Sequence, residues 1–166
     1  PIATGSIINN SVYYTALCDS KGNVWFGSSN HGMQKLNRNT NKFEQVKLDT
    51  SNSNAQWGQI FGLIELKNGG ILAADYGSGI KLYNHKLNAF KPYYFKPGFS
   101  PKEIQTIYED LSGNIWLGGS DQLINYSHSD STIIYFDIVS KYKIPSNSNI
   151  IDGLTEDYKG NIWAGI

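Results

Sequence analysis

The sequence is poor in the features that mark several large protein classes. It has one cysteine, Cys18, so no disulfide can form within the chain. Its apolar runs reach only four or five residues, too short for a membrane span, and no signal peptide is recognisable. Basic and acidic residues number 14 each, which leaves no basic patch for nucleic acid or a membrane surface. Helical apolar spacing is also missing, so helical repeats are excluded.

What the sequence does contain is a repeat rich in glycine and aromatic residues. The segment Asp19–Gly27 recurs at Asp110–Gly118 and at Asp157–Gly165, and Leu66–Ala74 is a weaker copy. The turn glycines stand at 22, 69, 113 and 160, which gives spacings of 47, 44 and 47 residues. A period in the forties is typical of propellers and of helical arrays.

The pattern inside one period decides between these two. In the first repeat, strand-forming segments alternate with turns, and the expected strands are 13–18, 24–27, 33–37 and 42–48. Gly22 and Asn23 are residue types that tolerate the positive φ of a tight hairpin turn, and Asp19 can accept hydrogen bonds from the turn's N–H groups. Four strands per period make one propeller blade. The sequence therefore predicts an all-β fold, a β-propeller built of four-stranded antiparallel blades.

Counting strands gives about three and a half blades, fewer than the four to eight of a closed ring. We therefore expect an incomplete piece of a larger propeller, whose terminal strand edges are covered by another chain or are mobile. The expected parts are a linker from a preceding blade at 1–12, blades at 13–48, 60–95 and 104–137, and the first two strands of a further blade at 150–166.

Residues that recur once per blade are best explained as scaffold. We expect the tryptophans at 25, 116 and 163 to pack between adjacent sheets, and Cys18 to be an ordinary strand residue, since it replaces the glutamate found at 65, 109 and 156. The small residues Thr15, Gly62, Thr106 and Gly153 share one position in the first strand of each blade, and we expect them to line the central channel. Their neighbours Ala16, Leu63, Ile107 and Leu154 should then face the adjacent sheet.

Binding residues are expected where the repeats differ. The connections at 49–59, 95–103 and 141–150 are long and irregular, and they should share one face with the short turns at 29–31, 75–78 and 120–122. Aromatic rings beside polar side chains suit a sugar, which offers an apolar face and hydroxyl groups. The predicted ligand-binding residues are Trp57, Tyr76, Phe99, Asp121 and Gln122, although Trp57 could equally fill a gap between blades.

The motif Asp-x-x-Gly-Asn-Ile/Val-Trp-x-Gly resembles the two-component regulator propeller repeat over nearly the whole chain. The second copy departs from it, with Leu66 for the aspartate and Leu72 for the tryptophan. The resemblance implies a periplasmic, ligand-sensing part of a hybrid two-component regulator, in which a histidine kinase module follows in the parent protein. It also implies an oligosaccharide ligand, the other blades of the parent as neighbours, and a homodimer.

Two other function classes are compatible with a propeller. One is a propeller scaffold that binds another protein, and the other is a glycan-processing enzyme such as a lyase or a sialidase relative. The sialidase Asp-box requires aspartate two positions before the glycine, where this chain has Ser20, Lys67, Leu111 and Tyr158. Glu109–Asp110 and Glu156–Asp157 adjoin turns and are expected to be turn residues rather than a catalytic pair. We expect no catalytic residue, no metal site and no cofactor.

Overall fold

The computed structural model describes residues 11–49, 56–145 and 149–166, and in these ranges the chain is almost entirely β-structure. The first blade comprises β1 (Tyr13–Cys18), β2 (Val24–Ser28), β3 (Met33–Asn37) and β4 (Lys42–Gln45). The second comprises β6 (Ile60–Glu65), β7 (Ile71–Asp75), β8 (Gly79–Asn84) and β9 (Ala89–Pro92), joined by β5 (Lys47–Leu48). The third comprises β10 (Ile104–Glu109), β11 (Ile115–Gly119), β12 (Gln122–Tyr126) and β13 (Ile133–Phe136). The helix α1 (Ile138–Tyr142) and the hairpin β14 (Gly153–Glu156) and β15 (Ile162–Gly165) follow.

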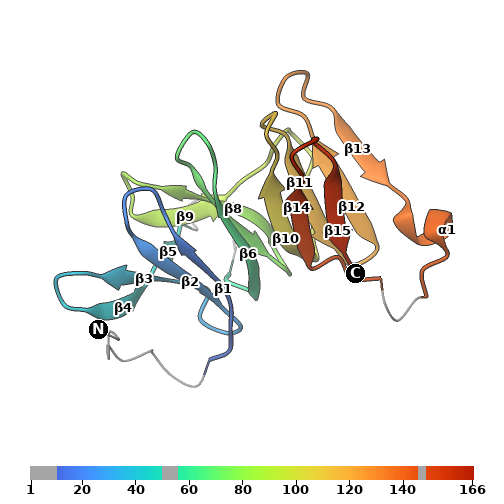
Figure 1. The fold of residues 1–166 in the computed structure, drawn as a ribbon. Helices are drawn as coiled ribbons and strands as arrows, with labels where there is room; N and C mark the ends of the chain where they lie inside the picture. Colours follow the sequence, from blue (N-terminus) through green and yellow to red (C-terminus); the bar gives the residue numbers. More distant parts are fainter. Residues whose placement is uncertain (1–10, 50–55, 146–148) are drawn as a thin grey trace.

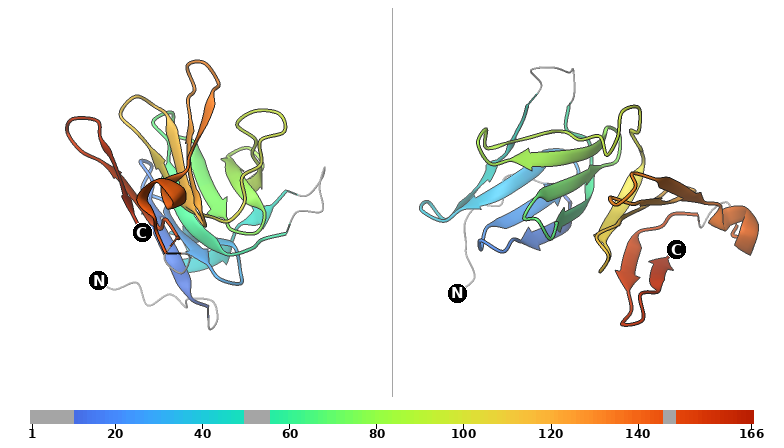
Figure 2. Two further views of the ribbon diagram at one scale, coloured as in Figure 1. Left: turned by 90° about the vertical axis from the view of Figure 1, so that its right-hand side faces the viewer. Right: turned by 90° about the horizontal axis from the view of Figure 1, so that it is seen from above.

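Each blade is an antiparallel meander whose strands lie in sequence order. The inner strands β1, β6, β10 and β14 follow one another across the molecule, and the sheets form an arc when seen from above (Figures 1 and 2). The described residues contain no closed ring of sheets. This confirms the predicted all-β fold, a partial propeller of four-stranded blades.

The strand expected at 42–48 is in fact two strands that belong to different blades. β4 pairs with β3, whereas β5 pairs in parallel with β9 of the second blade. The break falls at Val46, which is buried and donates its N–H to the Met33 carbonyl at 2.8 Å. Burying Val46 between the sheets turns the chain toward the second blade, so the outer strand of one blade also extends the next.

The core consists of layers between successive blades. Trp25 and Met33 of the first blade pack with Ile60, Leu63 and Phe90 of the second. A second layer joins the second blade to the third, and a third layer joins the third blade to β14. The second blade is therefore covered on both faces.

The small residues of the inner strands face the next blade, so the prediction that they line the channel is wrong. A Cβ on Gly62 would lie 3.0 Å from Ile107 Cγ2 in β10, and one on Gly27 would lie between Thr15 and Ile60. The blades stand radially, so their faces look at neighbouring sheets and only a strand edge borders the axis. Leu63 and Ile107 are buried against the neighbouring blades, as alternation along the strand predicts.

One expected connection contains structure that the sequence did not indicate. The connection expected at 141–150 begins inside α1, which is capped by the Asp137 carboxylate accepting from the Ser140 N–H at 3.0 Å. The expected linker 1–12 and the connections 49–59 and 141–150 fall partly outside the described residues. In the described part, no helix is long and apolar enough to cross a membrane.

Candidate ligand-binding site

The repeated motif builds one polar hub per hairpin. In the third blade, Asp110 accepts from the Asn114 N–H at 2.8 Å and from the Trp116 indole N–H at 2.8 Å. Asn114 also donates its side-chain amide to the same carboxylate at 3.0 Å. The same three partners occur at 19, 23 and 25 and at 157, 161 and 163. The aspartate was predicted to accept from the turn backbone, and the structure confirms this and adds the indole.

The hub shifts the acidity of its aspartates. Burial acts to raise the pKa of Asp110, but the hydrogen bonds from Trp116 and Asn114 outweigh it, so the pKa lies below the ordinary value. Asp19 is lowered in the same way. Hydrogen bonds from Asn161 are the main cause that lowers the pKa of Asp157 to about 2. These carboxylates are ionised structural acceptors, which suits a turn and not an acid catalyst.

The glutamate before each hub aspartate joins neighbouring blades. Glu109 accepts from the Lys67 N–H of the preceding blade at 2.6 Å. The same contact joins Glu65 to Ser20 and Glu156 to Leu111. The inner strands β6, β10 and β14 therefore each end on a carboxylate that accepts from the previous hairpin turn, a contact that we call the glutamate clamp. Cys18, which is exposed, occupies this position in β1.

The predicted loop face consists of the short turns and the long connections between blades. Where both are described, they are joined by backbone hydrogen bonds. The turn after β2 donates from Ser29 to the Val12 carbonyl at 2.9 Å. The turn after β7 donates from Tyr76 to the Gln59 carbonyl at 2.9 Å. The turn after β11 donates from Ser120 to Glu103, at 3.3 Å. Each short turn therefore lies beside the connection that enters its own blade.

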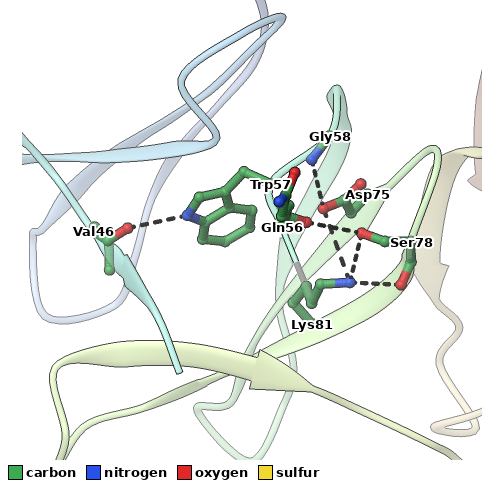
Figure 3. A network of polar contacts seen from close by, with 7 residues as sticks. All are labelled: Val46, Gln56, Trp57, Gly58, Asp75, Ser78 and Lys81. Carbon is green, nitrogen blue, oxygen red and sulfur yellow. Dashed lines mark hydrogen bonds and ion pairs between the residues drawn. The ribbon is translucent and has the colours of Figure 1, made fainter. Parts of the chain in front are cut away.

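Trp57 lies between the first two blades rather than on an open surface. Its indole N–H donates to the Val46 carbonyl at 3.3 Å (Figure 3). Its ring also meets Phe90 edge to face at 5.5 Å. A Cβ on Gly32 would fall 2.2 Å from this ring, so that position needs glycine both for space and for its φ of 61°. Trp57 is half-buried. These contacts are those of a residue that fills a gap between blades.

A buried ion pair lies beside Trp57 and fixes its loop. Asp75 and Lys81 are both fully buried, with Lys81 Nζ 3.9 Å from Asp75 Oδ2. Asp75 accepts from the Gly58 N–H at 3.0 Å, while Lys81 donates to the Ser78 carbonyl and hydroxyl at 2.6 and 3.0 Å (Figure 3). Burial lowers the pKa of Lys81, and the nearby Asp75 carboxylate opposes that shift. The Ser78–Lys81 contact is closed off from solvent on the lysine side, so it offers no open nucleophile.

Phe99 and Gln122 line one shallow depression at the loop end of the third blade, with Tyr135 beside them. Phe99 itself is buried and contributes to the core between the second and third blades. Gln122 donates to the Lys102 carbonyl at 3.2 Å. Asp121 has a φ of 56° and accepts a side-chain hydrogen bond from Asn149. Of these residues, Asp121 and Gln122 keep side-chain surface available to a ligand.

Tyr76 lies in the turn after β7. There it contacts Phe61 and Ser120, which were not among the predicted binding residues. Its ring meets Phe61 edge to face at 5.6 Å, and its hydroxyl lies 3.4 Å from the Ser120 hydroxyl. Phe61 in turn stacks on Tyr14 at 4.3 Å. Tyr76 is therefore contiguous with the 120–122 turn, whereas Trp57 belongs to a separate contact. The signal in the sequence was an aromatic residue directly before Thr15 and before Gly62.

In the described ranges, no three His, Cys, Asp or Glu side chains gather in a way that could hold a metal ion. The three histidines do not occupy one repeated blade position. What the loop face does offer is flat rings beside amides, hydroxyls and a carboxylate. Such a surface can bind a small polar ligand non-covalently.

Comparisons with known proteins agree with the repeat. Residues 6–30 match the family described as two component regulator propeller. A comparison with curated protein sequences gives no match. Among solved structures, the chain is similar to the extracellular domain of BT4673 from B. thetaiotaomicron, described as a hybrid two component system. That similarity has a TM-score of 0.72 at 22% identity and covers 97% of this chain and 20% of the other.

Two further structures show the same fold. The extracellular domain of BT3049 from the same organism gives a TM-score of 0.55 at 22% identity, covering 95% of this chain and 26% of that one. Virginiamycin B lyase from Staphylococcus aureus gives 0.67 at 15% identity, covering 96% and 50%. The chain thus spans about a fifth of the length of the extracellular domain of BT4673. Residues 6–30 therefore match the two component regulator propeller repeat, and the described residues have the fold of β-propeller blades.

Proposed function

We propose that this chain is part of the extracytoplasmic sensor propeller of a hybrid two-component regulator and that the sensor responds to an oligosaccharide. The observation that carries the proposal is the propeller repeat. Its first copy matches the regulator family, and the blades have the fold of extracellular domains of hybrid two component systems. The chain itself contributes binding and not catalysis. A homodimeric parent would pass the signal on, with ligand favouring one arrangement of the pair.

The loop face supports an oligosaccharide as the ligand. Tyr14, Phe61 and Tyr76 provide flat rings, and Asp121 and Gln122 provide polar groups on the adjoining turn. Formal charge is balanced across the chain, which favours a ligand without strong charge. Asp121, Gln122 and Tyr76 remain the predicted ligand-binding residues with accessible surface.

The test is calorimetric titration of the intact extracytoplasmic domain that contains this chain, using cellotriose, xylotriose, maltotriose and N-acetyllactosamine. Binding of at least one sugar is expected, and that sugar should also change the autophosphorylation rate of the full-length protein. Failure of every sugar to bind would contradict oligosaccharide sensing.

A protein-interaction scaffold is the second proposal, and one observation favours it. A depression of about 730 Å³ is lined by apolar side chains of the third blade, of α1 and of β15, among them Phe136, Ile138 and Trp163. Trp163 is 62% exposed. An apolar surface of this kind suits another blade or a protein partner.

A further inference from the structure

The inner strands share an irregularity that the repeat motif does not explain. The register between β1 and β2 shifts between Tyr13 and Thr15, so Tyr14 is skipped in the pairing. The same shift skips Phe61 in β6 and Gln105 in β10. A β-bulge turns the extra side chain away from its regular position and often occurs beside binding sites. Three blades thus present one bulge residue each at the same height.

Two of the bulge residues and two turn residues form a continuous strip. Tyr14 stacks on Phe61 with 4.3 Å between ring centroids and an interplanar angle of 29°. Phe61 meets Tyr76 at 5.6 Å, and the Tyr76 hydroxyl reaches the Ser120 hydroxyl at 3.4 Å. The strip therefore runs from the first blade to the third, along inner strands that lie side by side (Figure 1).

The strip is accessible in a way that core packing does not require. Tyr14 is 42% exposed, and Phe61, Tyr76, Gln105 and Ser120 are half-buried. By contrast, the aromatic residues that hold blades together, such as Trp25 and Phe90, are fully buried. The aromatic rings of the strip are therefore partly exposed to solvent, unlike the rings that pack between blades.

One register position changes character from blade to blade. In the first three blades it is occupied by Tyr14, Phe61 and Gln105. The aromatic half can stack on the C–H face of a sugar ring, and the amide can bind its hydroxyl groups. Ser120 adds a hydroxyl between the two halves.

We propose that Tyr14, Phe61 and Tyr76 form a stacking surface for a neutral sugar ring, with Gln105 and Ser120 as hydrogen-bonding partners of its hydroxyls. The ligand class rests on the proposed function. The location rests on the repeated bulges and is independent of it.

The test uses the intact extracytoplasmic domain and the sugar of the above series that binds best. Tyr14→Ala removes an exposed ring, and Phe61→Leu keeps an apolar side chain in case alanine at this half-buried position unfolds the blade. Gln105→Ala tests the polar half. The matched control is Tyr158→Ala, which removes an 89% exposed ring from the turn between β14 and β15.

Tyr14→Ala is expected to weaken binding about tenfold, the loss of one aromatic stacking contact. Gln105→Ala and Phe61→Leu should also weaken it, while Tyr158→Ala binds like wild type and all variants unfold cooperatively. Unchanged affinity in Tyr14→Ala and Gln105→Ala would overturn the site and leave oligosaccharide sensing standing. If the wild-type domain binds none of the sugars, both the sensing proposal and this site fail.

Discussion

At the scale of single residues, an aspartate carboxylate organises the turns of the β1–β2, β10–β11 and β14–β15 hairpins. Asp110 accepts from a backbone N–H, a side-chain amide and an indole, so its ionised form is strongly favoured in the folded state. Leu66 and Leu72 replace the aspartate and tryptophan in the second blade and are buried. That turn still keeps the Leu66–Gly70 backbone hydrogen bond at 2.7 Å, so the hairpin forms without the hub.

The hub aspartates predict acid sensitivity. Their pKa values are depressed on folding, so their stabilisation is complete above the ordinary value of 3.8 and is lost as the pH falls; for Asp157 the loss extends down to about 2. Asp110→Asn should lower stability at pH 7 and make the loss between pH 4 and pH 2 shallower. Urea unfolding across this range checks it, with Asp121→Asn as control. An unchanged slope in Asp110→Asn would contradict the hub's role.

The Asp75–Lys81 pair predicts a second effect at this scale. Lys81→Met leaves a fully buried carboxylate without its cation, so it should destabilise the chain by about 3 kcal/mol. Asp75→Leu combined with Lys81→Met should recover much of that loss, because no unpaired buried charge remains. Denaturant unfolding of the single and double variants measures both, and a double variant as unstable as the sum of the singles would refute the pairing.

At the scale of elements, the glutamate clamp joins each hairpin turn to the next inner strand. Glu109 contacts the Lys67 N–H, and Lys67 Nζ reaches back to the Asp110 and Leu111 carbonyls at 2.7 and 2.6 Å. The contact is therefore reciprocal between the second and third blades. Its repetition at Glu65 and Glu156 explains why glutamate precedes the motif aspartate.

Removing one clamp should loosen one blade junction. Glu109→Ala is expected to cost about 1 kcal/mol, because it leaves the Lys67 N–H to solvent, and Glu109→Gln should cost less because an acceptor remains. Thermal unfolding compares them with Glu44→Ala, which removes a carboxylate that accepts from Asn37 within the β3–β4 hairpin. A loss for Glu44→Ala as large as that for Glu109→Ala would argue against a clamp between blades.

The sequence predicted most strands and hairpins correctly, but it did not reveal all the residues of the candidate site. The 47-residue spacing and the turn glycines predicted the hairpins, because turn chemistry is local. Three features depend on contacts between blades and could not be predicted from local sequence. They are the pairing of β5 with the second blade, the packing of Trp57 between the first two blades, and the position of Gly62 against Ile107 of the third blade. Phe61 and Tyr14 were overlooked because a bulge changes side-chain direction, and alternation along a strand cannot reveal it.

At the scale of the whole molecule, packing is uneven along the arc. The second blade lies between two core layers, and every residue of β7 is buried. β15 pairs with β14 alone among the described strands, and most of its residues are exposed. Stability should therefore decrease from the second blade toward β15.

Hydrogen exchange should follow this gradient in the 166-residue chain. Amides of β7 and β8 are expected to exchange slowest and those of β15 fastest, because local opening is easiest where few apolar contacts hold a strand. Mass spectrometry of peptic fragments can resolve the strands. Protection of Ile162–Gly165 equal to that of β7 in a monodisperse monomer would contradict the gradient and the expectation of a covered or mobile edge.

The indole of each hub also gives the molecule built-in fluorophores. Trp25 is fully buried, Trp116 is half-buried and Trp163 is 62% exposed, yet all three donate to an aspartate in the same geometry. Differences in their emission wavelength and in quenching by acrylamide should therefore report solvent access rather than hydrogen bonding. In variants that retain one hub tryptophan, with phenylalanine at the other tryptophan positions, the emission of that tryptophan would report the local opening of a single blade.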